Sequence, residues 1–302
     1  MKVVITGAKG FIGRELVSQC IKNNIEVISI DQVETKEKDY FKADILSRDI
    51  YNLIPEGVDV IIHLAALSSD KACKDKAYDC FNVNVFGTLN LIEAAKNKGV
   101  KQFIFASTEW VYTDFKDNEI KNEESFIDIL KHKSEYALSK LISEANLKQQ
   151  YDRGFCHVTI LRFGIVYGLR EQSGSAIESL FRDVKTKEII EVGSLNTGRC
   201  FIEISDLVSG IINSIGLKGF NIINLQGDKF VTIGDIIEIS KKILNKNPKV
   251  MEKDKFNSDI KKVSNEKAKK LLNWYPNISL ETGLERLNYF LLNKENLKND
   301  SI

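Results

Sequence analysis

Strand-like and helix-like stretches alternate through the first half of the chain. Short runs at 3–5, 27–30, 40–43, 58–64, 103–105 and 157–162 have the length and composition of strands buried in a sheet. Between them apolar residues recur at spacings of three and four, as at Val85, Leu89 and Ile92, which indicates helices. This alternation predicts an α/β protein with a parallel, doubly wound sheet.

The pattern loosens after about residue 168. We expect helices at 176–187, 206–215 and from the Thr232–Asp235 cap to 244, and a last amphipathic helix marked by Leu280 and Leu291. Short strands are expected at 189–192, 199–203 and 220–225. The chain therefore divides into a sheet domain, 1–168, and a smaller α/β lobe for substrate, 169–302, with 220–225 adding a strand to the sheet.

A glycine-rich turn stands between the first strand and the first helix. Gly7 permits a tight turn, Gly10 lets a phosphate approach the backbone, and Gly13 lets the helix pack close to the strand. The free N–H groups and the positive dipole end of the helix then favour a pyrophosphate. The stretch Thr6–Gly13 predicts a dinucleotide-binding (Rossmann) domain.

The residue that ends the second strand selects among dinucleotides. Asp31 follows Gly13 by 18 residues, close to the ~20 typical of the carboxylate that binds the adenosine ribose. A carboxylate accepts hydrogen bonds from ribose hydroxyls and repels a 2′-phosphate. Asp31 is followed by Gln32, not by an arginine. We therefore expect NAD rather than NADP.

Composition and charge exclude several other classes of protein. The 302 residues carry 43 basic and 42 acidic side chains, so nothing in the balance calls for nucleic acid or an acidic membrane surface. No apolar run reaches the ~20 residues of a membrane span, and no signal peptide is expected before the first strand. Five scattered cysteines without a CxxC pair indicate free thiols, a cytoplasmic protein and no metal site.

A tyrosine and a lysine follow at helical spacing. Tyr136 and Lys140 share one helix face, and an ammonium near a phenol favours the phenolate and lowers its pKa. Ser107 and Thr108 end the preceding strand, where a hydroxyl can meet the tyrosine and a substrate oxygen. In this chain order, after the glycine turn and Asp31, the set predicts hydride transfer at a carbinol.

With these motifs the sequence resembles the extended short-chain dehydrogenases/reductases, in particular the NAD-dependent epimerase/dehydratase family with its UDP-glucose 4-epimerases. The resemblance covers nearly the whole chain. Matching segments are TGAKGFIG from Thr6, HLAA from His63, NVFGTLNLIEAA from Asn84, STEWVY from Ser107, YALSK from Tyr136, LRFGIVYG from Leu161, GRCFIEISDL from Gly198 and AKKLLNWYPNISLETGL from Ala268.

The resemblance implies a role for each matching residue. Thr108, Tyr136 and Lys140 would be the catalytic triad. The cofactor would contact Gly7, Gly10, Phe11, Ile12, Gly13, Asp31, Asp44, Ile45, Leu64, Ala65, Ala66, Asn84, Ser107, Tyr136, Lys140 and Phe163. Ser68, Glu109 and Arg199 would face a nucleotide-diphosphate sugar, with Arg199 on the diphosphate. Relatives also form homodimers through the helices that bear residues 84–96 and 134–151, so a homodimer is a candidate assembly here.

Three positions depart from the pattern of the family. Family dehydratases follow the threonine with an Asp-Glu pair, whereas this chain has Glu109 and Trp110, and decarboxylases keep a glutamate where Trp110 stands. Many members carry an asparagine where this chain has Ile165. We therefore expect a 4-epimerase first, with a sugar-nucleotide dehydrogenase or keto-sugar reductase second. A 4,6-dehydratase and a non-catalytic dinucleotide sensor come last.

Overall fold

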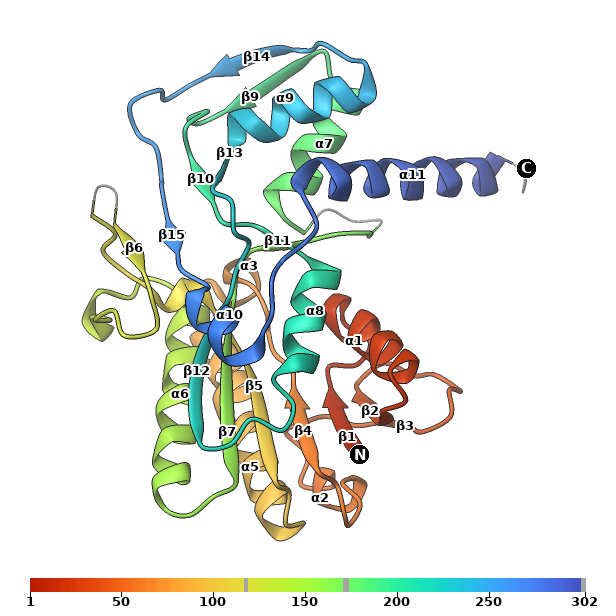
Figure 1. Ribbon diagram of the computed structural model, residues 1–302, viewed down its shortest axis with the longest axis vertical. Coiled ribbons are helices and arrows are strands. Elements are labelled where there is room, and N and C mark those ends of the chain that lie inside the picture. The colour runs from red at the N-terminus through yellow and green to blue at the C-terminus, as the bar shows by residue number, and fades with distance from the viewer. Residues whose placement is uncertain (117–118, 171–173, 300–302) are drawn as a thin grey trace.

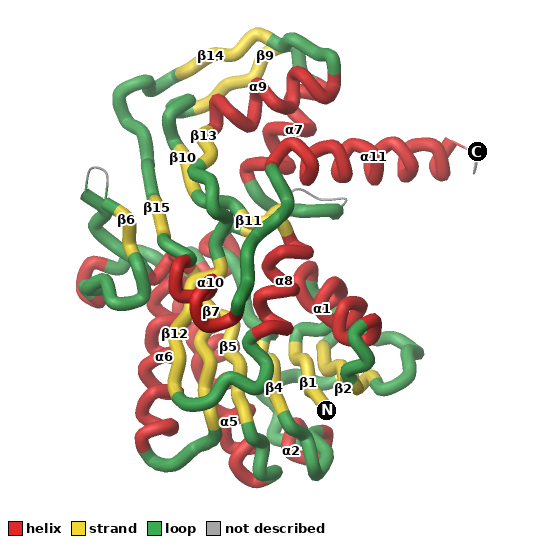
Figure 2. The backbone as a smooth tube through the Cα atoms, viewed as in Figure 1, coloured by secondary structure: helices red, strands yellow, loops and turns green. Residues whose placement is uncertain are grey.

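A parallel sheet of seven strands forms the centre of the molecule, in a computed structural model that describes residues 1–116, 119–170 and 174–299 (Figures 1 and 2). From one edge to the other, its strands are β12 (Phe220–Leu225), β7 (His157–Phe163), β5 (Gln102–Thr108), β4 (Val60–His63), β1 (Lys2–Thr6), β2 (Glu26–Asp31) and β3 (Tyr40–Lys42). All neighbouring pairs are parallel. The predicted doubly wound sheet is confirmed, and 220–225 does join it.

Helices cover both faces of this sheet, so the middle residues of its central strands, such as Val3–Ile5 and Val60–Ile62, are apolar and buried. One face packs on α1 (Phe11–Lys22) and α8 (Ile204–Asn213), through side chains such as Leu16 and Leu207. The other packs on α5 (Gly87–Asn97) and α6 (Glu135–Asp152), through Leu91 and Leu147. Every residue of β5 is buried as a result.

Shorter helical segments connect these elements. They are α2 (Ile50–Leu53), α3 (Asp70–Cys73), α4 (Ala77–Phe81), the π-helix η1 (Asn82–Phe86), the 3₁₀ turns η2 (Glu109–Val111) and η3 (Ile129–Lys131), and α10 (Glu266–Leu272).

The remaining elements form a smaller lobe with its own core, drawn at the top of Figure 1. They are β8 (Val166–Tyr167), α7 (Ala176–Thr186), β9 (Ile189–Val192), β10 (Gly198–Arg199), β11 (Ile202–Glu203), β13 (Val231–Thr232), α9 (Ile233–Leu244), β14 (Lys249–Glu252) and α11 (Leu280–Asn299). The Thr232 cap is confirmed, because its hydroxyl accepts the Asp235 N–H at 3.0 Å. The boundary between 1–168 and 169–302 stays a prediction.

The segment between β5 and α6 contains a further strand, β6 (Ile120–Lys121), which pairs with β15 (Lys262–Val263). Two local expectations were wrong. The expected strand at 199–203 is divided between β10 and β11, which pair with β13 and β8 respectively. Helix α8 begins at Ile204 rather than Asp206, because the Glu203 carboxylate accepts the Ser205 N–H at 2.6 Å and caps the helix.

The parallel register brings functional residues together. Parallel strands have their carboxyl ends at one edge, so Thr6, Asp31, His63, Thr108 and Phe163 all lie along the same edge of the sheet. Ligands of open α/β sheets bind at this edge.

Candidate active site

The glycine turn is closely packed where it leaves β1. Gly7 has a φ of 73°, and a Cβ atom there would lie 2.7 Å from the Ala65 nitrogen. A Cβ on Gly13 would lie 2.1 Å from the Gly7 oxygen. Both positions therefore require glycine, and helix α1 begins directly behind the turn at Phe11. This cradle fits the pyrophosphate of a dinucleotide.

Asp31 joins the end of β2 to the glycine turn. Its Oδ2 accepts the Lys9 N–H at 2.8 Å, and its Oδ1 accepts the Val33 N–H at 3.3 Å. The carboxylate is thus fixed beside the turn, where an adenosine ribose would lie. The place suits the predicted NAD site.

A pocket of about 420 Å³ at this sheet edge collects most of the predicted residues. Its lining includes Gly7, Gly10, Phe11, Ile12, Gly13, Leu64, Ala66, Ser68, Ser107, Thr108, Tyr136, Lys140 and Phe163. The predicted residues outside this lining are Asp31, Asp44, Ile45, Ala65, Asn84, Glu109 and Arg199.

Two of these outlying residues support the pocket from behind. Asn84, in the π-helix, accepts the Leu67 N–H at 2.8 Å and donates to the Leu67 carbonyl at 3.1 Å. It therefore holds the 64–68 segment, which lines the pocket. Ile45 is buried and packs so closely on Gly87 that a Cβ there would lie 2.5 Å from its Cδ1. Asp44 is exposed, and its Oδ1 accepts the Leu46 N–H at 2.9 Å.

The triad lies at the junction of β5 and α6. Thr108 is the last residue of β5, and its side chain lies close enough to Tyr136, in the first turn of α6, to lower the pKa of that phenol. Ser134 caps this helix by accepting the Ala137 N–H at 3.2 Å. Lys140 Nζ donates to the Ala106 carbonyl at 2.9 Å. All three predicted catalytic side chains therefore meet in one place.

Burial dominates the proton equilibria of the triad. It raises the pKa of Tyr136 to about 12, against the hydrogen bond from Thr108, which lowers it. Burial also lowers the pKa of Lys140 to about 8. The sequence predicted a Tyr136 pKa lowered by the Lys140 ammonium, and that prediction is wrong for this structure, because desolvation of the phenol raises its pKa and Thr108 is the one neighbour in the described part of the chain that lowers it.

Glu109 lies beneath the pocket rather than in it. Its side chain is buried, and burial raises its pKa to about 7, with Arg199 as the largest opposing influence. With its amide oriented to satisfy both neighbours, Gln226 donates to Glu109 Oε2 at 2.9 Å and accepts from the Gly164 N–H at 3.1 Å. The structure does not bring Glu109 to the surface that a sugar would contact.

Arg199 is held by its own chain. Its Nη1 donates to the Gly198 carbonyl at 2.8 Å and to the Asp259 carbonyl at 2.5 Å, and Nη2 forms an ion pair with the Asp259 carboxylate. Lys261 also lies 3.3 Å from that carboxylate. A diphosphate that used the same donors of the guanidinium would have to displace Asp259.

The sequence interpretation missed one end of the pocket. Gly174, Ser175 and Ala176 line it at the N-terminus of α7, where Ser175 and Glu178 form a capping box and the Gly174 and Ser175 N–H groups donate to the Glu178 carboxylate at 2.6 and 3.0 Å. Arg170 also lines the pocket, with its guanidinium carbon 4.0 Å from the centre of the Phe11 ring. Ser175 and Glu178 stand at the spacing of a helix start, which was the available signal.

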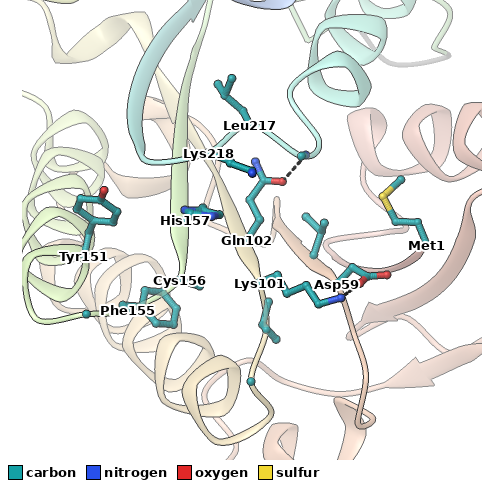
Figure 3. A pocket seen from close by; sticks show the side chains of 15 residues that line it. Met1, Asp59, Lys101, Gln102, Tyr151, Phe155, Cys156, His157, Leu217 and Lys218 are labelled. Carbon is teal, nitrogen blue, oxygen red and sulfur yellow. Dashed lines mark hydrogen bonds and ion pairs between the residues drawn. The ribbon is translucent and has the colours of Figure 1, made fainter.

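A second cavity lies at the opposite edge of the sheet, where the parallel strands begin, and Figure 3 shows the side chains that line it. It measures about 880 Å³ and is lined by residues at the start of β4, β5 and β7, including Asp59, Lys101 and His157. Lys101 and Asp59 form an ion pair at 2.7 Å within it. None of the predicted site residues belongs to this cavity.

The parallel sheet, the glycine cradle and the Thr–Tyr–Lys set define a short-chain dehydrogenase/reductase. The chain matches the NAD dependent epimerase/dehydratase family over residues 3–222. It is 31% identical to a UDP-glucuronate 4-epimerase of Thermodesulfobacterium geofontis, across 94% of each chain. The protein belongs to the NAD-dependent epimerase/dehydratase family, which confirms the resemblance and the expectation of an NAD-dependent enzyme.

Two further comparisons agree with this assignment. The chain is 29% identical to UDP-glucuronic acid decarboxylase 1 of Arabidopsis thaliana, covering 95% of this chain and 69% of that one. A solved UDP-glucuronic acid 4-epimerase from Bacillus cereus in complex with NAD superposes with a TM-score of 0.83 at 26% identity, over 96% of each chain. Within the described part of the chain, no helix has the length and apolar character needed to cross a membrane.

Proposed function

We propose that the protein is an NAD-dependent 4-epimerase of a nucleotide-diphosphate sugar. The observation that carries the proposal is the meeting of Thr108 and Tyr136 in the pocket that also contains the glycine cradle. Glu109 is buried and is not among the residues that line this pocket, and Trp110 occupies the next position. The acid–base pair that a dehydratase needs beside the threonine is therefore missing from the described lining residues.

The residues around the triad divide the work of the reaction. Tyr136, as phenolate, takes the proton from the sugar hydroxyl, and Thr108 holds that oxygen by a hydrogen bond. Bound NAD supplies the hydride acceptor and donor, and its oxidised nicotinamide carries a positive charge that favours the phenolate. The glycine turn, Asp31, Ser107, Lys140 and Phe163 would hold the cofactor. The carbon would be inverted when Tyr136 returns the proton to the oxygen and the hydride held by NAD returns to the other face of the sugar carbon.

Two features support a sugar joined to a diphosphate. The Ser175 hydroxyl, at the N-terminus of α7, offers an O–H donor to an anion inside the pocket. Trp110 offers an indole, 44% exposed, beside Thr108, against which the C–H face of a sugar could pack. The UDP-sugar names of the relatives point to the same substrate class. Ser68, which lines the pocket, is the remaining proposed sugar contact, and Arg199 would bind phosphate after exchange with Asp259.

A panel of substrates tests the proposal. The NAD-loaded enzyme is incubated with UDP-, GDP-, CDP- and dTDP-sugars, including uronic acids, and products are read by NMR and NADH by absorbance. We expect one sugar to give its C4 epimer without net NADH. Accumulation of NADH with a ketone product would instead favour the dehydrogenase, loss of carbon dioxide a decarboxylase, and no reaction with any sugar would contradict the proposal.

We also propose a homodimer and a cytoplasmic location. Tyr78 and Phe86, on α4 and the π-helix, are 82% and 58% exposed, which supports a contact through this helical face. Light scattering of the protein and of a Phe86→Lys variant tests the homodimer. We expect a dimer that becomes a monomer in the variant, and a monomeric wild-type protein would contradict the proposal.

The five free cysteines support the proposed cytoplasmic location, because the cytoplasm is a reducing compartment.

A further inference from the structure

A buried ion pair lies beneath the catalytic triad. Glu144 of α6 and Arg162 of β7 each have 4% of their side-chain surface exposed. Arg162 Nη2 lies 2.6 Å from Glu144 Oε2, and Arg162 Nε lies 3.1 Å from Oε1. The geometry is the bidentate fork that makes the strongest charge-assisted contacts. Neither residue lines the pocket, so neither can touch substrate or cofactor there.

The ion pair is hydrogen-bonded to residues on both sides of the segment that carries Thr108. On one side the Ser107 hydroxyl donates to Glu144 Oε1 at 2.5 Å. On the other side Arg162 Nη1 donates to the Tyr112 hydroxyl at 3.0 Å, and its guanidinium carbon lies 5.0 Å from the centre of the Tyr112 ring. Thr108 and the turn η2 therefore lie between two residues, Ser107 and Tyr112, that are both hydrogen-bonded to this ion pair.

One member of the pair, Glu144, lies on the helix that carries the other two catalytic residues. Glu144 stands one turn after Lys140 and two turns after Tyr136, and all three side chains are buried on one face of α6. The strand side and the helix side of the triad thus share one rigid connection. Tyr112 extends the network to the end of β12, because its hydroxyl donates to Asn224 Oδ1 at 2.8 Å.

We propose that Glu144 and Arg162 form a positioning unit that holds the Thr108 hydroxyl within hydrogen-bond reach of Tyr136. The inference rests on the proposed function, in which Thr108 and Tyr136 meet at the sugar oxygen. A buried ion pair of this kind contributes little net stability against an apolar pair of the same volume, because desolvation offsets its attraction. Its value to the enzyme lies in alignment, since a displacement of about 1 Å at a catalytic group can cost about 100-fold in rate.

The decisive variant replaces the whole pair, Glu144→Leu with Arg162→Met, so that no unpaired charge is left buried. We expect a folded protein that keeps its NAD and its KM within about threefold, while kcat falls about 100-fold. Arg162→Lys, which keeps the charge but loses the fork and the contact to Tyr112, should lose kcat to a smaller extent. The matched control is Lys148→Gln with Asp152→Asn, an exposed pair at 2.5 Å on the same helix, for which we expect unchanged kinetics.

Wild-type kcat in the folded double variant would overturn the inference. If that variant does not fold, Tyr112→Phe is the test instead, because it removes only the hydrogen bond between Arg162 and Tyr112. A lowered kcat at constant KM would support the positioning unit. An unchanged kcat would overturn it. A crystal structure of the folded variant gives a readout independent of turnover, in which we expect the Thr108 hydroxyl out of reach of Tyr136. An intact Thr108–Tyr136 bond there would also overturn the inference. Absence of epimerisation by the wild-type enzyme would instead count against the proposed function.

Discussion

The active-site pocket has two parts, which we call the floor and the wall, and different contacts stabilise them. The floor holds the glycine turn and the triad, and its catalytic side chains are buried and tied to β5 and α6 by hydrogen bonds such as Lys140 to Ala106. The wall faces the lobe and contains the half-exposed Trp110 and the partly buried Ile165. Behind it, Arg199 is engaged with Asp259.

This difference separates chemistry from choice of substrate. Positions in the floor are fixed by close backbone packing and by buried polar contacts, so they can hold a reacting hydroxyl in one geometry. Behind the wall, Arg199 is paired with Asp259, and this ion pair would have to open before a ligand could take the place of Asp259. Substitutions in the floor should therefore reduce kcat or cofactor binding, and substitutions in the wall should change KM.

The largest effect is expected from the catalytic base. Tyr136→Phe removes the proton acceptor, so we expect turnover to fall by about 10²–10⁴ while NAD stays bound. Steady-state kinetics and NAD content measure the two quantities. Tyr289→Phe, a change of the same kind on an exposed residue of α11, is the control and should be silent. Full activity of Tyr136→Phe would refute the assignment of the base.

Glu109, between floor and wall, should make stability depend on pH. Its folded pKa of about 7 lies above the ordinary 4.5, so its contribution to stability is present below pH 4.5 and is lost as the pH rises to about 7. Two and a half pKa units correspond to about 3 kcal/mol. Glu109→Gln, which stays neutral, should be more stable than wild type by up to that amount at pH 8 and equal to it near pH 4. Denaturant unfolding at both pH values checks this, and an equal difference at both would show that Glu109 does not titrate as described.

The glycine cradle offers a test with an internal control. Gly13→Ala places a Cβ 2.1 Å from the Gly7 oxygen, so the turn must shift and NAD should bind at least about tenfold more weakly. Gly193→Ala meets nothing within 4 Å and should leave NAD binding unchanged. Calorimetric titration with NAD gives both affinities. Equal NAD affinities of the two variants would show that the turn can accommodate the added methyl group at Gly13 without losing the cofactor.

The sequence alone was enough for the floor but not for the wall. Gly7, Thr108 and Tyr136 each sit in a local motif, and a parallel sheet necessarily brings the ends of its strands to one edge. The orientation of Glu109 and the partner of Arg199 depend instead on contacts with residues far along the chain. Asp259, for example, is 60 residues beyond Arg199.

The same limit applied to the support beneath the triad. Glu144 could be placed on the face of Tyr136 from helical spacing, whereas its pairing with Arg162 required the packing of α6 on β7. The Tyr136 pKa was misjudged for a related reason, since spacing shows a nearby lysine but not the extent of burial.

Trp110 should have the smallest effect, and it tests the wall directly. Loss of its indole in Trp110→Ala removes a packing surface for the sugar, so we expect KM to rise about tenfold with kcat nearly unchanged. The chain has two tryptophans, and Trp274 is buried with its Nε1 donating to the Asp206 carbonyl at 2.9 Å. Quenching of the fluorescence by substrate should therefore come from Trp110 and vanish in the variant. A fall in kcat of the size expected for Tyr136→Phe would show that Trp110 takes part in the chemistry. It would contradict the assignment of chemistry to the floor and of substrate choice to the wall.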